Sequence, residues 1–503
     1  MKKIKDFVKK YWFIISIVIL SLLRFLFTYR LPSFYLSNMN YDDNLMIDNL
    51  NSLLGKSYLG VVYTKKTLIK GMLFPFLLMI TRIYKLSYSS VFTLLYIASS
   101  LFFTLSLKNI IKEKKYLIVV LIVLLFNPVT YSQDLFQRLY RNSISITELL
   151  FFLGALIKVI FCKNKKIFNN ILLGISLSFM FLTREDNIWT YPILMFLIGY
   201  NIFKEKRIKT VIISLIPIVI LYGALNLVSY INYKHYGIYT YNEIQKSEFH
   251  NTYKKILQIK DDEKIEKVAI PKSTFYKLVD NTSSFGVSKS EIDDFYKKYA
   301  GTNGEIYNGN IIWYFRDIVD RNKQFVTGKE SEKYYKKLGK EIDILFEKGI
   351  LEKEFTMPSS FMSVPTKKEF KKLPINLFKT IAYTTSYKNI KTMTNTVKYE
   401  YDKKVEAYYF EYEDYHHTIN ITKKNPIFIE IIRLIYKYLT IIMSIICLFI
   451  YFKNILKFDN FSIISHILVV CYGLIVAGTA YTHTTSFHAI RPLYLGNVYI
   501  LQN

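Results

Sequence analysis

Two adjacent carboxylates, Asp42 and Asp43, stand in the stretch SNMNYDDNLMIDNL, shortly after the first long apolar segment. A carboxylate in such a place is suited to act as a general base, which takes a proton from an attacking hydroxyl group. Aspartate is equally suited to begin a helix or to stabilise a turn, so the pair alone leaves both interpretations open. The choice depends on the other ionisable residues and on the elements that position them.

Three more segments place ionisable side chains directly beside apolar runs. They are FNPVTYSQDLFQRLYRNS (126–143) with Arg138 and Arg141, LTREDNIWTYP (182–192) with Arg184, Glu185 and Asp186, and YTHTTSFHAIRPLY (481–494) with His483, His488 and Arg491. Each has a structural alternative: Arg138 and Arg141 could reach to the membrane interface, the 184–186 triplet could pair with itself in a tight turn, and the histidines could be surface residues. Their recurrence in separate short segments favours a functional site, because ionisable groups at membrane depth are costly.

The elements that must position these residues are long apolar segments. The chain of 503 residues is 51% hydrophobic, and its apolar residues gather in runs of about 16–25, the length of a membrane-spanning helix. We expect nine spans, at about 11–29, 88–107, 116–132, 143–161, 168–184, 188–203, 210–231, 427–452 and 460–480. The shorter run at 71–86 is expected to lie in or dip into the outer surface, with a tenth span as the alternative. The fold class predicted is an α-helical polytopic membrane protein with about 9–10 spans.

Short basic loops at 108–115, 162–166, 204–209 and 453–457 predict which side of the cell membrane is cytoplasmic. With these loops inside, the basic N-terminus and its apolar segment form an uncleaved signal anchor, and all four polar segments lie outside. Residues 232–425 are polar and of domain length, and we expect an extracytoplasmic α+β or mainly α domain there. This domain separates an N-terminal transmembrane module (1–231) from a C-terminal transmembrane segment with an outer tail (426–503).

The formal net charge of +28 reflects Lys and Arg near the apolar segments. We attribute it to membrane topology and to attraction by anionic lipid in the bilayer, and we expect no nucleic-acid partner. The three cysteines, Cys162, Cys447 and Cys471, lie in or beside apolar runs. They therefore cannot form a disulfide within residues 232–425, and their spacing is not that of a metal site.

A carboxylate base combined with cations at a membrane surface suits the transfer of a sugar from a lipid phosphate. The carboxylate would take the proton of an acceptor hydroxyl as its oxygen attacks the anomeric carbon. Arginine or histidine would neutralise the departing lipid phosphate. Water-soluble nucleotide sugars are cytoplasmic, so transfer on the outer face needs a lipid-linked donor.

The stretches YDDNLMIDNLNSLLGKSYLG and LIKGMLFPFLLMI resemble the opening of the GT-C glycosyltransferases, the bacterial relatives of protein mannosyltransferases and aminoarabinose transferases. Asp42 and Asp43 match the acidic pair of that family in position, and KGMLFPF is similar to its surface helix, with Pro75 in place of the usual double proline. LTREDNIW is similar to an Arg-Glu-Glu/Asp-x-x-Trp element of Gram-positive membrane glycosyltransferases. The resemblance covers roughly residues 10–230. In that family the soluble domain typically follows all spans, whereas here it precedes the last two.

The resemblance implies a polyprenyl-phosphate-linked sugar as donor and a cell-envelope glycan, glycolipid or protein as acceptor. It implies one of Asp43 and Asp42 as the base. We favour Asp43, which would lie deeper if a helix begins at Asn44; the other would orient the acceptor or a divalent cation, and no cofactor is certain. The expected phosphate-binding residues are Arg138, Arg141, Arg184 and Arg491, with Glu185, Asp186, His483 and His488 in support. Trp313 and the run 408–417 are candidates for stacking on sugar rings.

Three other classes remain open from the sequence. A polysaccharide polymerase or ligase would share the outward arginines and the lipid-linked substrate, but typically carries its main polar loop late in the chain. A transporter (flippase) for lipid-linked saccharides typically has ionisable groups near mid-membrane and often an internal repeat, and we find no repeat in this sequence. An acyltransferase would need an intramembrane histidine, and His466 has no acidic residue nearby in the sequence.

Overall fold

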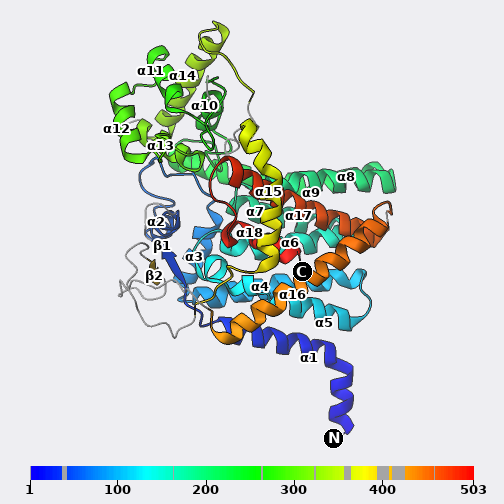
Figure 1. Ribbon diagram of the computed structural model, residues 1–503. Helices are drawn as coiled ribbons and strands as arrows, with labels where there is room; N and C mark the ends of the chain where they lie inside the picture. Colours follow the sequence, from blue (N-terminus) through cyan, green and yellow to red (C-terminus); the bar gives the residue numbers. More distant parts are fainter. Residues whose placement is uncertain are drawn as a thin grey trace.

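Figure 1 shows the protein as a computed structural model, which describes residues 2–36, 42–162, 164–261, 264–321, 325–355, 364–393, 407–409, 425–457 and 459–502. Within these residues the regular structure is helical, apart from two isolated bridges and one antiparallel pair of three-residue strands, β1 (Phe34–Leu36) and β2 (Ala407–Tyr409). Short turns of 3-10 or π helix occur at Leu107–Asn109, Pro128–Tyr131, Gln133–Gln137 and Asn187–Trp189.

Within the part of the chain that the structure describes, nine helices follow the apolar segments of the sequence. They are α1 (Lys2–Thr28), α4 (Tyr88–Ser106), α5 (Lys114–Leu125), α6 (Asn142–Phe161), α7 (Lys166–Thr183), α8 (Thr190–Glu205), α9 (Ile208–Tyr236), α16 (Ile427–Asn454) and α17 (Asn460–Thr485). Seven of them, all except α5 and α8, are long and apolar enough to cross a bilayer. The prediction of an α-helical, multi-pass membrane protein is confirmed at this level.

Two of the nine expected spans coincide with shorter helices, since α5 has 12 residues and α8 has 16. The predicted span at 116–132 is interrupted because Asn127 precedes Pro128, and a residue before proline is driven out of the helical region. Asn127 is extended, and its side chain accepts the Val129 amide, which starts a separate one-turn segment. After this break the chain forms two short turns, Pro128–Tyr131 and Gln133–Gln137, before α6 begins at Asn142.

The apolar helices pack side by side around a core of leucine, isoleucine and aromatic side chains. In Figure 1 most of them run roughly parallel across the picture, and the connections α8–α9 and α16–α17 lie at the right. The helices α2 (Asp43–Leu54) and α3 (Leu73–Ile83) lie at the opposite end. With 11 residues, α3 is about 16 Å long, roughly half of the hydrocarbon thickness that a spanning helix must cross.

A second layer of helices covers this opposite end of the bundle. Its members are α10 (Glu248–Ile256), α11 (Lys272–Asn281), α12 (Lys289–Tyr299), α13 (Asn308–Arg321) and α14 (Gly328–Glu347). They enclose an aromatic core of their own, into which Leu59, Tyr63, Leu68 and Ile69 of the α2–α3 connection also pack. The described part of this domain is therefore mainly α, the second of the two alternatives expected; the domain boundaries stay a prediction.

Two further helices complete the chain around this end. The helix α15 (Lys367–Ser386) contacts α17, and α18 (Pro492–Leu501) packs against both α17 and α6. Figure 1 shows α15 running across the bundle helices from the domain toward α16. Contacts of Tyr140 with Asp42, of Arg141 with Glu185 and of Gly71 with the Leu182 carbonyl bring the α2–α3 segments, the end of residues 126–143 and the turn after α7 together.

Candidate functional site

The two carboxylates of the acidic pair have different surroundings. The helix α2 begins at Asp43, one residue earlier than expected, and the Asp43 side chain is fully buried. Arg138 donates two hydrogen bonds to it, from Nε to Oδ2 at 2.8 Å and from Nη2 to Oδ1 at 2.6 Å, and the Leu36 amide donates to Oδ2 at 3.1 Å. Asp43 therefore joins β1, α2 and the segment before α6.

Asp42 precedes α2 and retains contact with solvent. Its side chain is 28% exposed, and its Oδ2 receives the Lys70 ammonium at 2.9 Å and the Tyr140 hydroxyl at 3.2 Å. It makes no side-chain hydrogen bond to the start of the helix, so the capping interpretation does not describe it. Burial opposes ionisation of this carboxyl, but Lys70, Arg141 and Tyr140 outweigh it and hold the pKa of Asp42 below its ordinary value.

Arg141 and Glu185 form a second buried ion pair. Arg141 donates from both terminal nitrogens to the two Glu185 oxygens, with Nη2–Oε1 at 2.9 Å, and both side chains are at least nine-tenths buried. Burial works against the charge on Glu185, yet Arg141 and then Lys70 outweigh it and lower the pKa of Glu185. The Arg138 and Arg141 guanidinium groups both lie over the ring of Tyr140, at 5.3 and 5.9 Å from its centre. These two arginines are thus buried and paired with carboxylates inside the protein.

The 184–186 triplet is divided between two roles. Arg184 pairs with Asp186 of the same turn, as the structural alternative expected, and the Asp186 side chain is 57% exposed. Glu185 instead points to Arg141. Only the middle residue of the triplet therefore takes part in the buried network.

The remaining predicted residues lie in the α17–α18 connection. The rings of His483 and His488 are 4.7 Å apart, and the Arg491 Nε donates to the His488 carbonyl at 2.7 Å. Burial, followed by Arg491 and Lys267, lowers the pKa of His488, so this ring is largely neutral at neutral pH. In the described part of the chain, no carboxylate lies within ion-pair distance of Arg491, whose guanidinium stacks over Tyr494 at 5.8 Å.

Lys70 is the residue that our sequence reasoning missed. Its ammonium group pairs with Asp42 and lies 5.4 Å from the centre of the Trp313 ring on α13. The following residue, Gly71, lies so close to the turn after α7 that an added Cβ would stand 2.2 Å from the Leu182 carbonyl oxygen. This approach brings Lys70 next to Glu185. The only signal in the sequence was a lysine directly before a glycine in the LIKGMLFPF stretch.

We call Asp42, Lys70, Tyr140, Arg141 and Glu185 the polar cluster. The buried Asp43–Arg138 pair adjoins this cluster through the neighbouring residues Asp42 and Tyr140. The Arg184–Asp186 pair lies on either side of Glu185 in the sequence. Arg491 and the two histidines lie beyond Tyr494, which is within electrostatic reach of both Asp42 and Arg491. Among the described residues, no group of three or more His, Cys, Asp and Glu side chains could hold a metal ion. Most of the aromatic run 408–417 lies outside the described residues.

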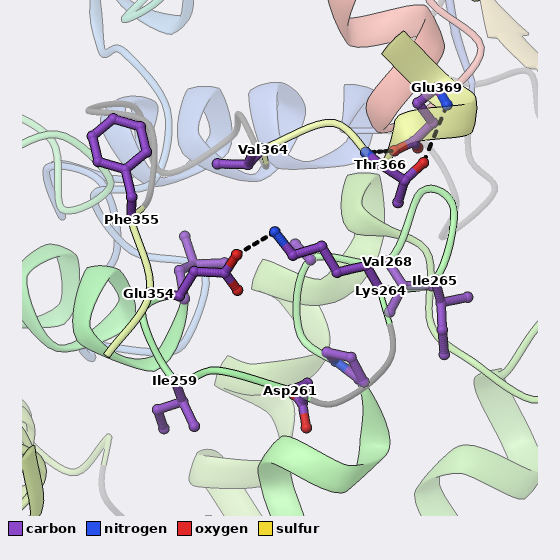
Figure 2. A pocket seen from close by; sticks show the side chains of 13 residues that line it. Ile259, Asp261, Lys264, Ile265, Val268, Glu354, Phe355, Val364, Thr366 and Glu369 are labelled. Atoms are coloured by element: carbon purple, nitrogen blue, oxygen red, sulfur yellow. Dashed lines mark hydrogen bonds and ion pairs between the residues drawn. The ribbon is translucent and has the colours of Figure 1, made fainter. Parts of the chain in front are cut away.

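A separate cavity of about 60 Å³ lies in the domain and contains none of the predicted site residues. Figure 2 shows Lys264 and Glu354 pairing across it, with Thr366 and Glu369 at the start of α15 on its far side. None of the residues that line this cavity belongs to the polar cluster.

No family model matches this chain, and no curated protein or solved structure matches it either. The fold and the site define an α-helical, multi-pass membrane protein with a cluster of ionisable side chains between its helix bundle and a helical domain.

Proposed function

We propose that this protein is a GT-C-type glycosyltransferase that moves a sugar from a polyprenyl-phosphate carrier to an acceptor hydroxyl on the outer face of the cell membrane. The observation that carries the proposal is the Asp42–Lys70 pair. It places a partly exposed carboxylate of lowered pKa beside a cation, at the end of the bundle opposite to the basic loops. Base and cation are the two groups that sugar transfer from a lipid phosphate requires.

Asp42 acts as the general base, in place of the Asp43 that the sequence favoured. Both contacts of Asp42 use Oδ2, so that among the described residues Oδ1 has no partner and can accept the proton of the acceptor hydroxyl. Both oxygens of Asp43 are occupied by Arg138, and the side chain is inaccessible. Asp43 is a positioning residue that holds the start of α2, and with it Asp42, in place.

The departing phosphate is neutralised by Lys70 and Arg491. Lys70 carries three donors, of which Asp42 occupies one. Arg491 has no carboxylate partner in the described part of the chain and presents a fork that matches phosphate oxygens. Arg141 and Arg184 are already paired with Glu185 and Asp186, and they orient the cluster.

The test uses the purified protein in lipid nanodiscs with a panel of polyprenyl-phosphate sugars and possible glycan, glycolipid and protein acceptors, and measures free polyprenyl phosphate. We expect one donor to be consumed, and Asp42→Asn to lose roughly 100-fold or more in rate while it remains folded. Asp48→Asn, an exposed carboxylate on the same helix, is the matched control and should keep full activity.

Either of two results overturns the proposal. The first is that no donor is consumed by wild-type protein; the second is that Asp42→Asn matches wild type. A polysaccharide polymerase or ligase, or a transporter for lipid-linked saccharides, would then take precedence. Polymerisation would appear as chain lengthening of a lipid-linked oligosaccharide, and transport as movement of a labelled lipid across a sealed vesicle without release of phosphate.

A further inference from the structure

Trp313 lies where the helical domain meets the polar cluster. It packs at the edge of the domain core and also at the edge of the core formed around α2 and α3, which includes Met46 and Phe74. Its side chain is only partly buried. The domain, which the chain inserts before its last two long helices, thus contributes an aromatic ring to the site.

The indole ring and the Asp42 carboxylate flank the same ammonium group. Lys70 Nζ is 2.9 Å from Asp42 Oδ2 and 5.4 Å from the centre of the Trp313 ring. Within the described residues the Trp313 indole N–H makes no hydrogen bond, whereas the indole of Trp189 donates to Asn187 at 3.2 Å. Trp313 therefore offers a partly exposed indole and an unused donor beside the proposed base.

Trp313 lies on α13 between two residues that fix the helix in place, Gly309 and Arg316. At the start of the helix, Gly309 packs so tightly on Phe487 that an added Cβ would stand 2.9 Å from that ring, and Phe487 in turn contacts Tyr494. Further along α13, Arg316 pairs with buried Glu243 at 2.6 Å and donates to the Lys65 carbonyl at 2.7 Å. The same contacts tie α13 to the segment that carries Lys70.

We propose that Trp313 and Lys70 form a binding platform for the acceptor saccharide, on which the C–H face of a pyranose ring stacks against the indole while a hydroxyl group reaches Asp42 Oδ1. The assignment to the acceptor rests on the proposed function, because the acceptor hydroxyl is the group that must meet the base. An indole is suited to this because it combines the largest aromatic face with a polar edge. Of the two Lys70 donors that Asp42 does not occupy, one then donates to a neighbouring hydroxyl of the same sugar, and the other remains for the departing phosphate.

Saccharide binding can be measured by tryptophan fluorescence, without any transfer reaction, because the chain contains only three tryptophans. Trp12→Phe combined with Trp189→Phe leaves Trp313 as the sole indole fluorophore. Methyl glycosides of glucose, galactose, mannose and N-acetylglucosamine are then titrated onto this protein in nanodiscs. We expect a saturable change in emission with at least one of them, and Lys70→Met should weaken that binding about ten-fold.

Tyr314→Phe is the matched control, since Tyr314 neighbours Trp313 in sequence but packs against Phe295 and Tyr299 within the domain. It should leave the titration unchanged. A folded single-tryptophan protein that shows no saturable response to any of the four glycosides overturns the proposal. So does a response that Lys70→Met leaves unaltered.

Kinetics separate this proposal from the proposed function. With an active donor, Trp313→Ala should raise the KM for the acceptor about ten-fold and leave the KM for the donor unchanged. A rise in the KM for the donor alone would overturn the platform and leave the glycosyltransferase standing. A saturable emission change without any release of polyprenyl phosphate would support the platform and overturn the glycosyltransferase.

Discussion

The Asp43 carboxylate and the Arg138 guanidinium, 95 positions apart in the chain, meet in a two-pronged ion pair with no exposed surface on the carboxylate. Asp42, its immediate neighbour, faces the other way and pairs with Lys70. Of the two adjacent aspartates, Asp43 therefore stabilises the fold, and Asp42 is the one that remains accessible.

This division predicts opposite phenotypes for the two aspartates. Asp43→Ala leaves Arg138 buried without its partner and should cost about 3–5 kcal/mol of stability, seen as a large fall in the thermal midpoint in detergent. Asp42→Ala should lower that midpoint less, because the Asp42 side chain is 28% exposed and the Lys70 ammonium that it leaves behind still interacts with Glu185. Equal destabilisation by both substitutions would contradict the division.

Glu185 and Asp186 offer a similar comparison within one turn. Glu185→Gln removes the counter-charge of buried Arg141 and should destabilise the protein by about 3–5 kcal/mol. Asp186→Asn removes a partner that is 57% exposed and should cost less than about 1 kcal/mol. Unfolding in urea measures both, and a larger effect at Asp186 would show that the buried pair is not the dominant one.

The pH dependence of transfer should report Asp42. The pKa of Asp42 in the folded protein is lowered, by Lys70 above all, so the carboxylate is ionised at neutral pH. Its ion pair with Lys70 is fully formed at any pH above the ordinary pKa of an aspartate. Activity, and the stability contributed by the pair, should persist as the pH falls and be lost only as it passes through the lowered pKa. Lys70→Met should move the acid limb of the rate profile to higher pH. Lys66→Met, an exposed lysine of the same segment, should leave it in place.

Gly71 should be intolerant of even one methyl group. A Cβ there would stand 2.2 and 2.6 Å from the carbonyl oxygens of Leu182 and Thr183, and these are backbone atoms that cannot turn away. Gly71→Ala should therefore displace Lys70, destabilise the protein by about 1–3 kcal/mol and lower activity. Gly199→Ala on α8, where an added Cβ meets nothing within 4 Å, is the control and should be neutral.

The orientation in the membrane is open to a labelling test. In a variant without Cys162, Cys447 and Cys471, a single cysteine at exposed Thr302 of the domain should react with a membrane-impermeant maleimide in intact cells. A single cysteine at exposed Lys457, between α16 and α17, should react only after the membrane is opened. The reverse pattern would place the polar cluster on the cytoplasmic side and remove the need for a lipid-linked donor.

Much of the fold was accessible from the sequence, because a membrane-spanning helix satisfies its backbone locally and its apolar length is written in consecutive residues. Seven expected spans lie on helices long and apolar enough to cross a bilayer. The early end of α5 was also readable in principle, from Asn127 before Pro128. The residues chosen as ionisable candidates, such as Arg141 and Glu185, were recognisable because charges beside apolar segments are rare.

The ion-pair partners of these residues could not be predicted from the sequence. Asp42 and Asp43 are adjacent and chemically identical, and only the direction in which α2 starts decides which one meets Arg138 and which one meets Lys70. The lysine stands 28 positions beyond Asp42, and Trp313 lies in a different domain, so no spacing rule joins them. The sequence by itself determined which segments are helices and where charge collects. Only the tertiary structure decided how those charges pair, because ion pairing depends on contacts between residues far apart in the chain.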